Sequence, residues 1–286
     1  QTETETEKST ETETQTETET EENTEAETQE DMLQTETWVD ENGEMFTGLR
    51  VNGLLEGEGA WECTDGDDRW WYEGNFENGK RSGYGVYHWP DGSRYEGEWR
   101  DNERTGYGID YYSNGDIYEG EWLNNERAGT GVYKYAEGGR YEGDWLKDQK
   151  SGTGVSYDEH GNKIYKGEWL HDVQSGIGTY YYSNGDVYNG EWQDGERTGE
   201  GSYYCVNGER YEGKWLNSKM DGAGAFYFVN GDYFEAEWKD GLVLPHLALY
   251  SSSGTMEEAD FNWEAIFQGN EITFEKQKDY VRNYIS

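Results

Sequence analysis

The sequence predicts an all-β fold: an elongated, single-layer antiparallel β-meander of hairpin repeats, followed by a short C-terminal cap made of a hairpin and a helix. Three observations predict this fold. An aromatic-x-Gly motif returns about every 23 residues, and such a sustained period is typical of repeat architectures. The chain contains 40 glycines and only 2 prolines, which indicates many tight turns and close backbone contacts. Its 25 tyrosines and 13 tryptophans supply the buried surface that aliphatic residues usually supply.

Residues 1–36 form a Thr/Glu-rich, low-complexity tract that we expect to be a disordered acidic linker. Thirteen acidic residues and one lysine stand in the first 35 positions. Such a tract cannot bury enough apolar surface to offset its chain entropy. Charged linkers repel themselves and extend, which favours a spacer that holds the folded part away from an anchor. A disordered tail with a partner of its own is the alternative.

The predicted repeat array covers residues 37–241 and contains about eight copies of one unit. Each copy has an aromatic-x-Gly box, and a Gly-x-Gly pair lies between successive boxes. Successive boxes are 26, 23, 23, 23, 24, 23, 23 and 23 residues apart. Their aromatic residues are Phe46, Tyr72, Tyr95, Tyr118, Tyr141, Tyr165, Tyr188, Tyr211 and Phe234.

Each repeat is expected to contain two short antiparallel strands, because "YEGEW" and "GYGIDYY" both alternate with period two. Dipeptides such as Asn114-Gly115 follow the second strand, and they tolerate the positive φ angles of a tight hairpin turn. The other connection, "RDNERT" before Gly106, is predicted to be a polar loop of about six residues.

Strand alternation predicts that Tyr95, Gly97 and Trp99 share one face, with Glu96 and Glu98 on the other. Glycines in the neighbouring strands are expected to receive the rings, so that the sheet builds a core without a second layer. The structural repeat positions predicted in this way are Tyr72, Gly74, Tyr95, Gly97, Trp99, Gly106, Gly108, Tyr118, Gly120, Trp122, Gly129, Gly131, Tyr141, Gly143, Trp145, Gly152, Gly154, Tyr165, Gly167, Trp169, Gly176, Gly178, Tyr188, Gly190, Trp192, Gly199, Gly201, Tyr211, Gly213 and Trp215.

Residues 242–286 depart from the repeat and are predicted to be a C-terminal cap. The segment "PHLALYSSSGTMEEADFNW" has the pattern of one more hairpin, turning at Ser253-Gly254. The following "FEKQKDYVRNYI" places Phe274, Val281 and Ile285 on one helical face, together with Lys278. We expect this helix to close the open edge of the sheet and so prevent end-to-end strand pairing.

The composition excludes several classes of function. A formal net charge of -39 and the lack of a basic stripe argue against a nucleic-acid partner. No stretch approaches the ~20 apolar residues needed to span a membrane. The two cysteines, Cys63 and Cys205, lie about six repeats apart, too far for an internal disulfide.

No catalytic, cofactor or metal site is predicted. Paired carboxylates such as Glu96/Glu98 recur in nearly every repeat, which indicates a surface pattern and not one specially shaped active site. Weak cation binding along this acidic face is the alternative. The four histidines lack a metal-site spacing, and no Gly-x-Gly opens a helix as a phosphate loop would.

Each copy combines the same parts: Tyr-x-Gly-x-Trp, a polar connection, Gly-x-Gly, and an aromatic segment ending in Asn-Gly or Asp-Gly. This combination resembles the MORN (membrane occupation and recognition nexus) repeat. The resemblance covers residues 43–241, about 70% of the chain. It is weakest in the first copy, where Leu49-Arg50 replaces the Trp region, and in the last, where Ala236 stands in place of Gly. Terminal copies of repeat arrays are expected to be atypical. The resemblance implies a non-enzymatic scaffold at membranes, cytoskeleton or ciliary structures.

Three functions fit these observations. The first is a rod that binds protein partners or associates with itself, with membrane tethering as an option. The second, implied by the family name, is lipid (phosphoinositide) binding, which the balanced charges of Arg104, Arg127, Lys150 and Arg197 in the predicted loops disfavour. The third is cell-wall or carbohydrate binding through exposed aromatic rings. The Thr/Glu tract resembles spacers of bacterial surface lipoproteins and favours an extracytoplasmic location; a cytoplasmic or cytoskeletal one is the alternative.

Overall fold

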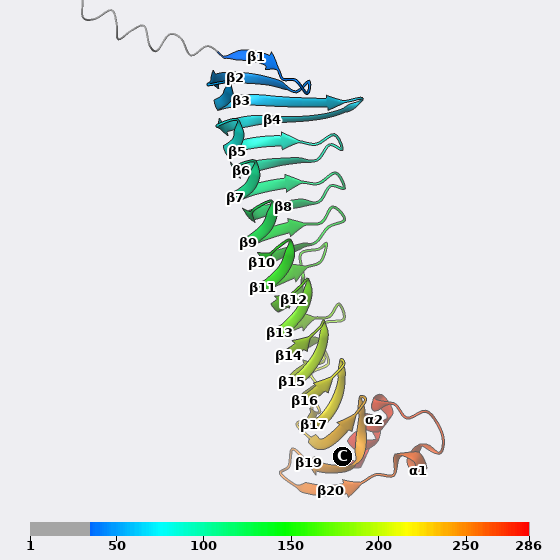
Figure 1. Ribbon diagram of the computed structural model, residues 1–286. Helices are drawn as coiled ribbons and strands as arrows, with labels where there is room; N and C mark the ends of the chain where they lie inside the picture. Colours follow the sequence, from blue (N-terminus) through cyan, green and yellow to red (C-terminus); the bar gives the residue numbers. More distant parts are fainter. Residues whose placement is uncertain (1–34, 286) are drawn as a thin grey trace, which may run out of the picture.

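A single antiparallel sheet of 20 strands forms the body of the protein (Figure 1). The computed structural model describes residues 35–285. Every strand pairs with the next one in sequence, from β1–β2 to β19–β20, so this described range is one continuous meander without a crossover. Figure 1 shows a long rod, with the two helices at its C-terminal end. The predicted all-β, single-layer meander is confirmed.

The strands are seven to twelve residues long along most of the rod. They are β1 Glu36–Val39, β2 Met45–Val51, β3 Leu54–Asp65, β4 Asp68–Glu77, β5 Lys80–His88, β6 Arg94–Arg100, β7 Glu103–Tyr111, β8 Ile117–Leu123, β9 Glu126–Lys134, β10 Arg140–Leu146, β11 Gln149–Tyr157, β12 Lys163–Leu170, β13 Val173–Tyr181, β14 Val187–Gln193, β15 Glu196–Tyr204, β16 Arg210–Leu216, β17 Lys219–Tyr227, β18 Tyr233–Lys239, β19 Leu242–Tyr250 and β20 Met256–Asp260. The helices are α1 Trp263–Phe267 and α2 Phe274–Ile285.

The connection predicted to be a six-residue polar loop is a two-residue turn. Arg100 pairs directly with Glu103, and the two residues between them, Asp101 and Asn102, have φ angles of 50° and 71°. Two positive φ angles in succession define the hairpin turn whose twist matches that of the strands. The prediction was wrong here because Asp and Asn tolerate the left-handed region almost as well as Gly does.

The Asn-Gly connection is the longer of the two. Tyr112 and Asp116 close a loop in which the amide of Gly115 donates to the carbonyl oxygen of Tyr112. Only Gly115, with φ of 91°, is left-handed, so this is a type I turn followed by a glycine bulge. The carboxylate of Asp116 accepts hydrogen bonds from Tyr133 Oη and from the amide of Ala136 in the next repeat. The loop therefore ties adjacent repeats together.

A row of glycines crosses the sheet at right angles to the strands. Cross-strand pairing joins these residues without a break from Gly48 to Gly224. The ring of Tyr118 lies over two of them: a Cβ atom built on Gly131 would come within 2.6 Å of its Cε2, and one built on Gly120 within 2.6 Å of its hydroxyl oxygen. The absence of side chains along the row thus makes room for the tyrosine rings. We call the face that carries these rings the inner face.

The tyrosines and tryptophans of the repeats form one edge-to-face ladder along the inner face. Tyr95 lies between Trp99, at 5.2 Å, and Trp122, at 5.4 Å between ring centroids. The same contact continues from Tyr72 to Trp238 with centroid distances of 5.0 to 5.5 Å. Edge-to-face pairs add about 0.5–1.5 kcal/mol each beyond area burial. The ladder is the hydrophobic core of the rod.

Both polar tips of each Tyr–Trp pair are satisfied by backbone carbonyls. Tyr118 Oη donates to the carbonyl oxygen of Glu121 at 3.0 Å, and Trp122 Nε1 donates to that of Gly108 at 3.3 Å. Burial raises the pKa of Tyr118 well above its ordinary value. A neutral, hydrogen-bonded phenol can therefore remain inside the sheet.

The first glycine of each Gly-x-Gly pair shapes a bulge and does not receive a ring. Gly97 pairs with Gly108, but the next residue, Glu98, pairs with Thr105. Gly106, with φ of 56°, and its neighbour Tyr107 therefore have no partner in β6, although both pair with β8 on the other side. Such bulges bend a strand and increase its twist, and the strands along the rod are curved in Figure 1.

In five repeats, the acid that directly precedes the tryptophan caps the bulge. Glu98 Oε1 accepts the amide of Tyr107 at 3.0 Å. The equivalent acceptors are Glu121 for Thr130, Asp144 for Thr153, Glu168 for Ile177 and Glu191 for Glu200. From the sequence, these acids were interpreted as a surface pattern, with weak cation binding as the alternative. Their position opposite an unpaired amide shows that they also hold the strand bend.

The glycine row ends where the predicted last copy departs from the motif. Ala236 pairs with Gly224 on one side and with Leu247 on the other. The ring at this point belongs to Phe234, which is fully buried. Because phenylalanine has no hydroxyl group, it needs less space over the backbone than tyrosine, and this explains why a methyl group is tolerated here.

The C-terminal cap contains the expected hairpin and helix, but the helix lies on a face of the sheet. The edge strand is β20, whereas α2 packs against β19. Gln277 of α2 is buried; its side chain accepts the amide of Val243 at 3.0 Å and donates to the carbonyl oxygen of Val243 at 2.9 Å. Sequence analysis missed α1. The expected disordered tail lies, up to residue 34, outside the described residues, and the domain limits at 36/37 and 241/242 stay predictions.

Substituting Gly131 by valine is expected to destabilise the fold by about 1–3 kcal/mol, because the new side chain overlaps the Tyr118 ring. Urea unfolding followed by circular dichroism measures the change. Ser202→Val is the matched control, since Ser202 is half-buried and stands on the opposite face of β15. Equal stability of Gly131→Val and the wild type would contradict the ring-over-glycine packing.

Glu121→Gln is expected to lower stability at pH 7 by up to about 1 kcal/mol, and the difference should shrink on acidification. Hydrogen bonds from the Thr130 amide and hydroxyl hold the pKa of Glu121 below its ordinary value of 4.5. The stabilisation is therefore complete above that value and is lost as the pH falls through the lower, folded-state pKa. Urea unfolding of both proteins at pH 7 and pH 3 tests this; a constant difference would rule out the proposed cap.

Candidate functional site

Basic residues of the repeats lie on strands of the inner face, over the tryptophan rings. The guanidinium carbon of Arg104 is 4.1 Å from the centroid of the Trp122 ring, and Arg104 Nη2 donates to the carbonyl oxygen of Asn125 at 2.8 Å. Equivalent contacts join Arg81 to Trp99, Arg127 to Trp145, Lys150 to Trp169 and Arg197 to Trp215, at 4.4 to 5.1 Å. The predicted loop positions of these cations were wrong because the loop itself is a two-residue turn.

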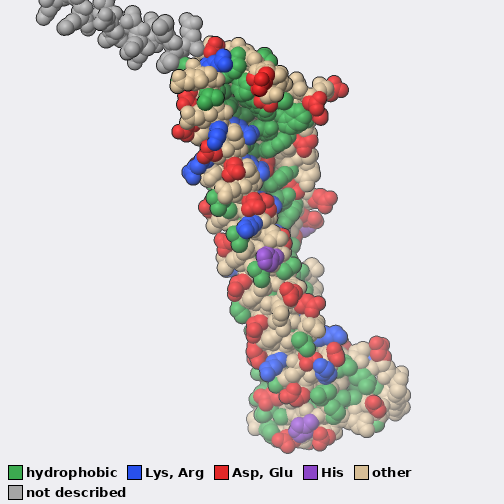
Figure 2. Space-filling view, viewed as in Figure 1, with side chains coloured by type: hydrophobic (Ala, Val, Ile, Leu, Met, Phe, Trp, Pro, Cys, Tyr) green, Lys and Arg blue, Asp and Glu red, His purple; other side chains and the backbone are tan. Residues whose placement is uncertain are grey.

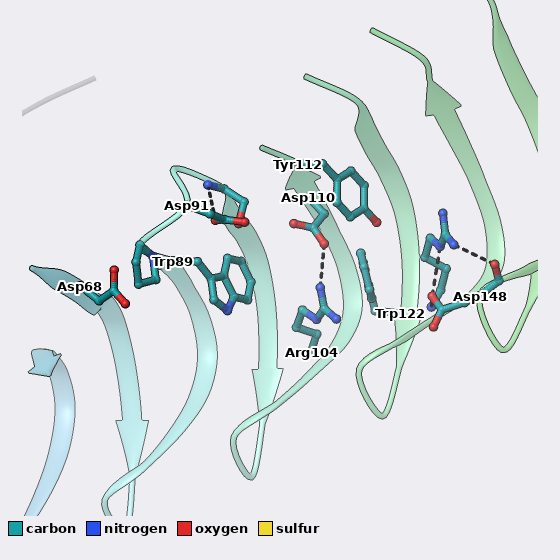
Figure 3. Close-up of a pocket in the computed structure, with 11 residues that line it drawn as sticks. Asp68, Trp89, Asp91, Arg104, Asp110, Tyr112, Trp122 and Asp148 are labelled. Carbon is teal, nitrogen blue, oxygen red and sulfur yellow. Dashed lines mark hydrogen bonds and ion pairs between the residues drawn. The ribbon is translucent and has the colours of Figure 1, made fainter. Parts of the chain in front are cut away.

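A groove lies beside this row, on the side of the Asn-Gly loops. Near the N-terminal end of the rod it opens into a hollow of about 840 Å³. Figure 3 shows that the lining side chains come from several successive strands and loops. The hollow is lined by Asp68, Trp89, Pro90, Asp91, Ser93, Arg104, Asp110, Tyr112, Trp122, Arg127 and Asp148.

The groove is repetitive, because the same repeat position supplies its wall in each copy. Trp89 and Tyr112 begin their loops, and the residue 23 positions later is Tyr135. Further along, the same position is held by Asp158, Tyr182, Cys205 and Phe228. Tilted ring contacts join successive rows, such as Tyr112 to Tyr133 at 5.8 Å. The position is aromatic in most copies, and Asp158 and Cys205 interrupt the aromatic surface.

Asp110 interrupts the aromatic floor of the groove. The equivalent residues of adjacent repeats are Tyr87 and Tyr133, whereas Asp110 is a carboxylate that is only 4% exposed. Its Oδ2 accepts a hydrogen bond from Arg104 Nη1 at 2.7 Å (Figure 3). Burial raises the pKa of Asp110, and the guanidinium groups of Arg104 and Arg127 oppose that shift. Nothing in the sequence except the break in periodicity signals this residue.

At the C-terminal end, helix α2 occupies the groove. Phe274 continues the aromatic ladder, with its ring centroid 5.1 Å from Trp238 and 5.3 Å from Phe226. Lys278 Nζ lies 3.2 Å from Oε2 of the buried Glu209. Arg282 also pairs with Glu209, and its guanidinium carbon is 5.2 Å from the ring centroid of Phe228.

The exposed fraction of the aromatic side chains in the groove differs between the stretch that α2 covers and the stretch that it leaves open. Phe228, under α2, is 5% exposed, whereas Tyr135, at the same repeat position in the open stretch, is 39% exposed. Arg282 of α2 lies over the ring of Phe228 and contributes to this difference, while Trp89 and Tyr112 in the open stretch are half-buried. The open stretch therefore presents the surface that α2 buries elsewhere.

Glu209 is held ionised by its partners. Burial acts against ionisation, but a hydrogen bond from Asn207 and the charges of Lys278 and Arg282 outweigh it, so that the pKa of Glu209 is lowered. Sequence analysis placed Lys278 on the helix face that also carries Phe274 and Val281. It gave no role to Glu209, which stands where other copies have Asp186 or Asp232.

The outer face is acidic and carries its cations in local pairs. Arg94 bonds to Glu96 at 2.7 Å, and its guanidinium carbon is 3.7 Å from the ring centroid of Tyr111. Figure 2 shows acidic and basic side chains interspersed along the rod, with no continuous basic stripe on the face it views. Lys214 stands where other copies have the bulge-capping acid, and there Gly222 has φ of 101°, away from the usual values near 55°.

Residues 35–285 were compared with the requirements of a metal site, a disulfide and a membrane-spanning helix. No group of three or more His, Cys, Asp or Glu side chains is placed there to hold a metal ion. Cys63 and Cys205 are both free thiols. None of the helices in the same range is long and apolar enough to cross a membrane.

Glu209→Gln is expected to weaken docking of α2 by about 3 kcal/mol, because it removes the buried charge that pairs with the buried Lys278 and with the half-exposed Arg282. Hydrogen exchange should then speed up in residues 274–285 and stay unchanged in strands β6–β13. Glu212→Gln is the control, since Glu212 pairs with Arg210 on the outer face. Unchanged protection of α2 in Glu209→Gln would show that the ion pairs do not hold the helix.

Comparison with solved structures gives only distant likenesses. The TCP domain of SAS-4 from Drosophila melanogaster, in complex with a proline-rich motif of Ana2, is 14% identical, covers 70% of this chain and 88% of its own, and superimposes with a TM-score of 0.27. A virginiamycin B lyase from Staphylococcus aureus with quinupristin is 12% identical over 81% of this chain and 86% of its own, with a TM-score of 0.15. Superpositions at this level say nothing about function.

Comparison with curated protein sequences gave no match. The MORN repeat family, in contrast, matches seven consecutive segments at residues 72–94, 95–117, 118–140, 141–162, 165–187, 188–210 and 211–233. These segments coincide with the copies that carry the complete Tyr–Trp ladder and the glycine row, and they account for more than half of the chain. The protein therefore belongs to the MORN repeat family.

Proposed function

We propose that this protein is a non-catalytic scaffold that binds a segment of a partner protein in its inner-face groove. One observation carries the proposal: helix α2 fills the C-terminal stretch of the groove, while the same surface is open between Trp89 and Tyr135. A helix laid in a groove through aromatic and charged anchors is a common mode of peptide recognition. Helix α2 is thus an example of the kind of segment that we expect the open stretch of the groove to bind.

The architecture supports this role because it holds the groove rigid. Each repeat contacts its neighbours through the tyrosine–tryptophan ladder and through loop carboxylates such as Asp116. A pre-formed aromatic surface loses little conformational entropy on binding, which raises affinity. Membrane tethering through residues 1–36 is part of the proposal as a spacer that presents the rod.

Catalysis is disfavoured by the roles of the acidic residues. The carboxylates that recur in pairs cap bulges, as Glu98 does, or pair with arginines, as Glu96 does. A catalytic pair needs groups aimed at a shared substrate atom. The carboxylates of the outer face are instead engaged in holding the strands.

Lipid binding receives less support than protein binding. Arg104 and Arg127 are folded over tryptophan rings and pair with Asp110 and Asp148. Cations engaged in this way cannot also neutralise phosphoinositide headgroups without losing their partners. The aromatic rings also pack on one another along the ladder, which leaves fewer of them as open platforms for sugars.

Site-specific photo-crosslinking tests the proposal. Benzoylphenylalanine at Tyr112, in the groove, is expected to form an adduct with a partner protein in the native cells, whereas the same group at Tyr107, exposed on the outer face of the preceding strand β7, is not. Mass spectrometry identifies the adduct. The purified partner should then bind Tyr112→Ala at least about tenfold more weakly than it binds the wild type. It should bind Tyr107→Ala as tightly as the wild type.

Adducts that form only at Tyr107 would place binding on the outer face and overturn the proposal. An adduct of two copies of this chain at Tyr112 would show that the groove serves self-association. Loss of affinity in both alanine variants to the same extent would also count against a groove-specific site.

A further inference from the structure

The open hollow of the groove carries an excess of acidic groups. Four carboxylates line it, those of Asp68, Asp91, Asp110 and Asp148, against the two guanidinium groups of Arg104 and Arg127. Arg104 pairs with Asp110 at 2.7 Å and Arg127 with Asp148 at 3.1 Å. The remaining two carboxylates, Asp68 and Asp91, leave the rim negative, so a cationic group is favoured there over an anionic one.

Aromatic rings flank the buried carboxylate of the hollow. In Figure 3 the Asp110 carboxylate lies between the side chains of Trp89 and Tyr112. Both rings are only half-buried. A carboxylate with acceptor capacity beside aromatic faces is a favourable environment for a guanidinium or ammonium group.

Helix α2 shows how this groove holds such a group. Its Arg282 lies over the ring of Phe228 and pairs with buried Glu209, and Lys278 Nζ lies 5.7 Å from the ring centroid of Phe226. Phe228 stands at the repeat position of Trp89 and Tyr112, and Phe226 at that of Asp110. The covered stretch therefore binds two cations with the same combination, an aromatic wall and a buried carboxylate, that the open hollow offers.

We propose that the open hollow between Trp89 and Asp148 receives a basic segment of the partner protein, with an arginine or lysine directed at Asp110 between the rings of Trp89 and Tyr112. This inference rests on the proposed function and adds the chemistry of the partner. The net charge of -39 also favours a basic partner over a second copy of this chain. Helix α2 of a second copy would first have to leave its own Glu209.

The test uses the full chain and a fluorescent synthetic peptide based on residues 271–285, in which Glu271 and Glu275 are changed to glutamine and Asp279 to asparagine, so that the three cations of this segment make the peptide basic. Fluorescence anisotropy at low salt should show binding to the wild type. A peptide with Lys276, Lys278 and Arg282 all changed to glutamate should bind at least about tenfold more weakly. Asp110→Asn should weaken binding of the basic peptide about tenfold, the value of one charge-assisted hydrogen bond.

Two further variants keep the test decisive. Asp110→Tyr also removes the carboxylate but restores the residue of the adjacent repeats, so it is expected to fold even if Asp110→Asn leaves Arg104 unpaired and unstable. It should lose the same affinity. Tyr107→Ala, on the outer face, should bind the basic peptide as the wild type does.

Three results would overturn the inference. These are no binding of the basic peptide, equal binding of the acidic peptide, or loss of binding in Glu209→Gln instead of in the Asp110 variants, which would mean that the probe only exchanges with α2. None of these results bears on whether crosslinking from Tyr112 captures a partner. A failure of the inference is therefore distinguishable from a failure of the proposed function.

Discussion

The tyrosine ring packed over a pair of glycines is the interaction on which this structure depends. A single-layer sheet has no second layer against which to bury apolar side chains, and it would ordinarily be too exposed to be stable. Here the rings lie flat against bare backbone, and each is held between two tryptophans. The phenol and indole tips return to carbonyl oxygens of the same sheet. The core is thereby built from the sheet's own inner face.

This packing accounts for the rest of the repeat. The rings need a curved surface around them, and the bulge at the first glycine of each Gly-x-Gly pair supplies the bend. The bulge leaves an amide without a strand partner, and a carboxylate such as Glu98 accepts it. The high acidic content is thus partly structural. Because neighbouring copies share these contacts, the repeats are interchangeable in shape and differ in what they display in the groove.

Differences among copies mark the functional surface. Asp110 is a buried acid where the adjacent copies have tyrosines, and Glu209 is a buried acid where other copies have Asp186 or Asp232; both pair with basic side chains. One of them holds a helix of the same chain. Buried charges are costly unless they are paired, so acids at these two positions are informative. They divide the groove into a stretch that is already occupied and a stretch that is open.

The sequence by itself determined the meander, its period and its family, because the aromatic, glycine and turn residues act through local geometry that repeats in every copy. It also predicted one shared face for Tyr95, Gly97 and Trp99, since strand alternation follows from the backbone. The sequence did not predict three features. These are the exchange of turn types at Asp101-Asn102 and Gly115, the bulge at Gly106, and the position of Arg104 over Trp122. Register between strands decides all of these, and one unpaired residue changes which groups meet. Only the tertiary structure could show that α2 lies in the groove, because its anchor, Glu209, is distant in sequence and looks like one more surface acid.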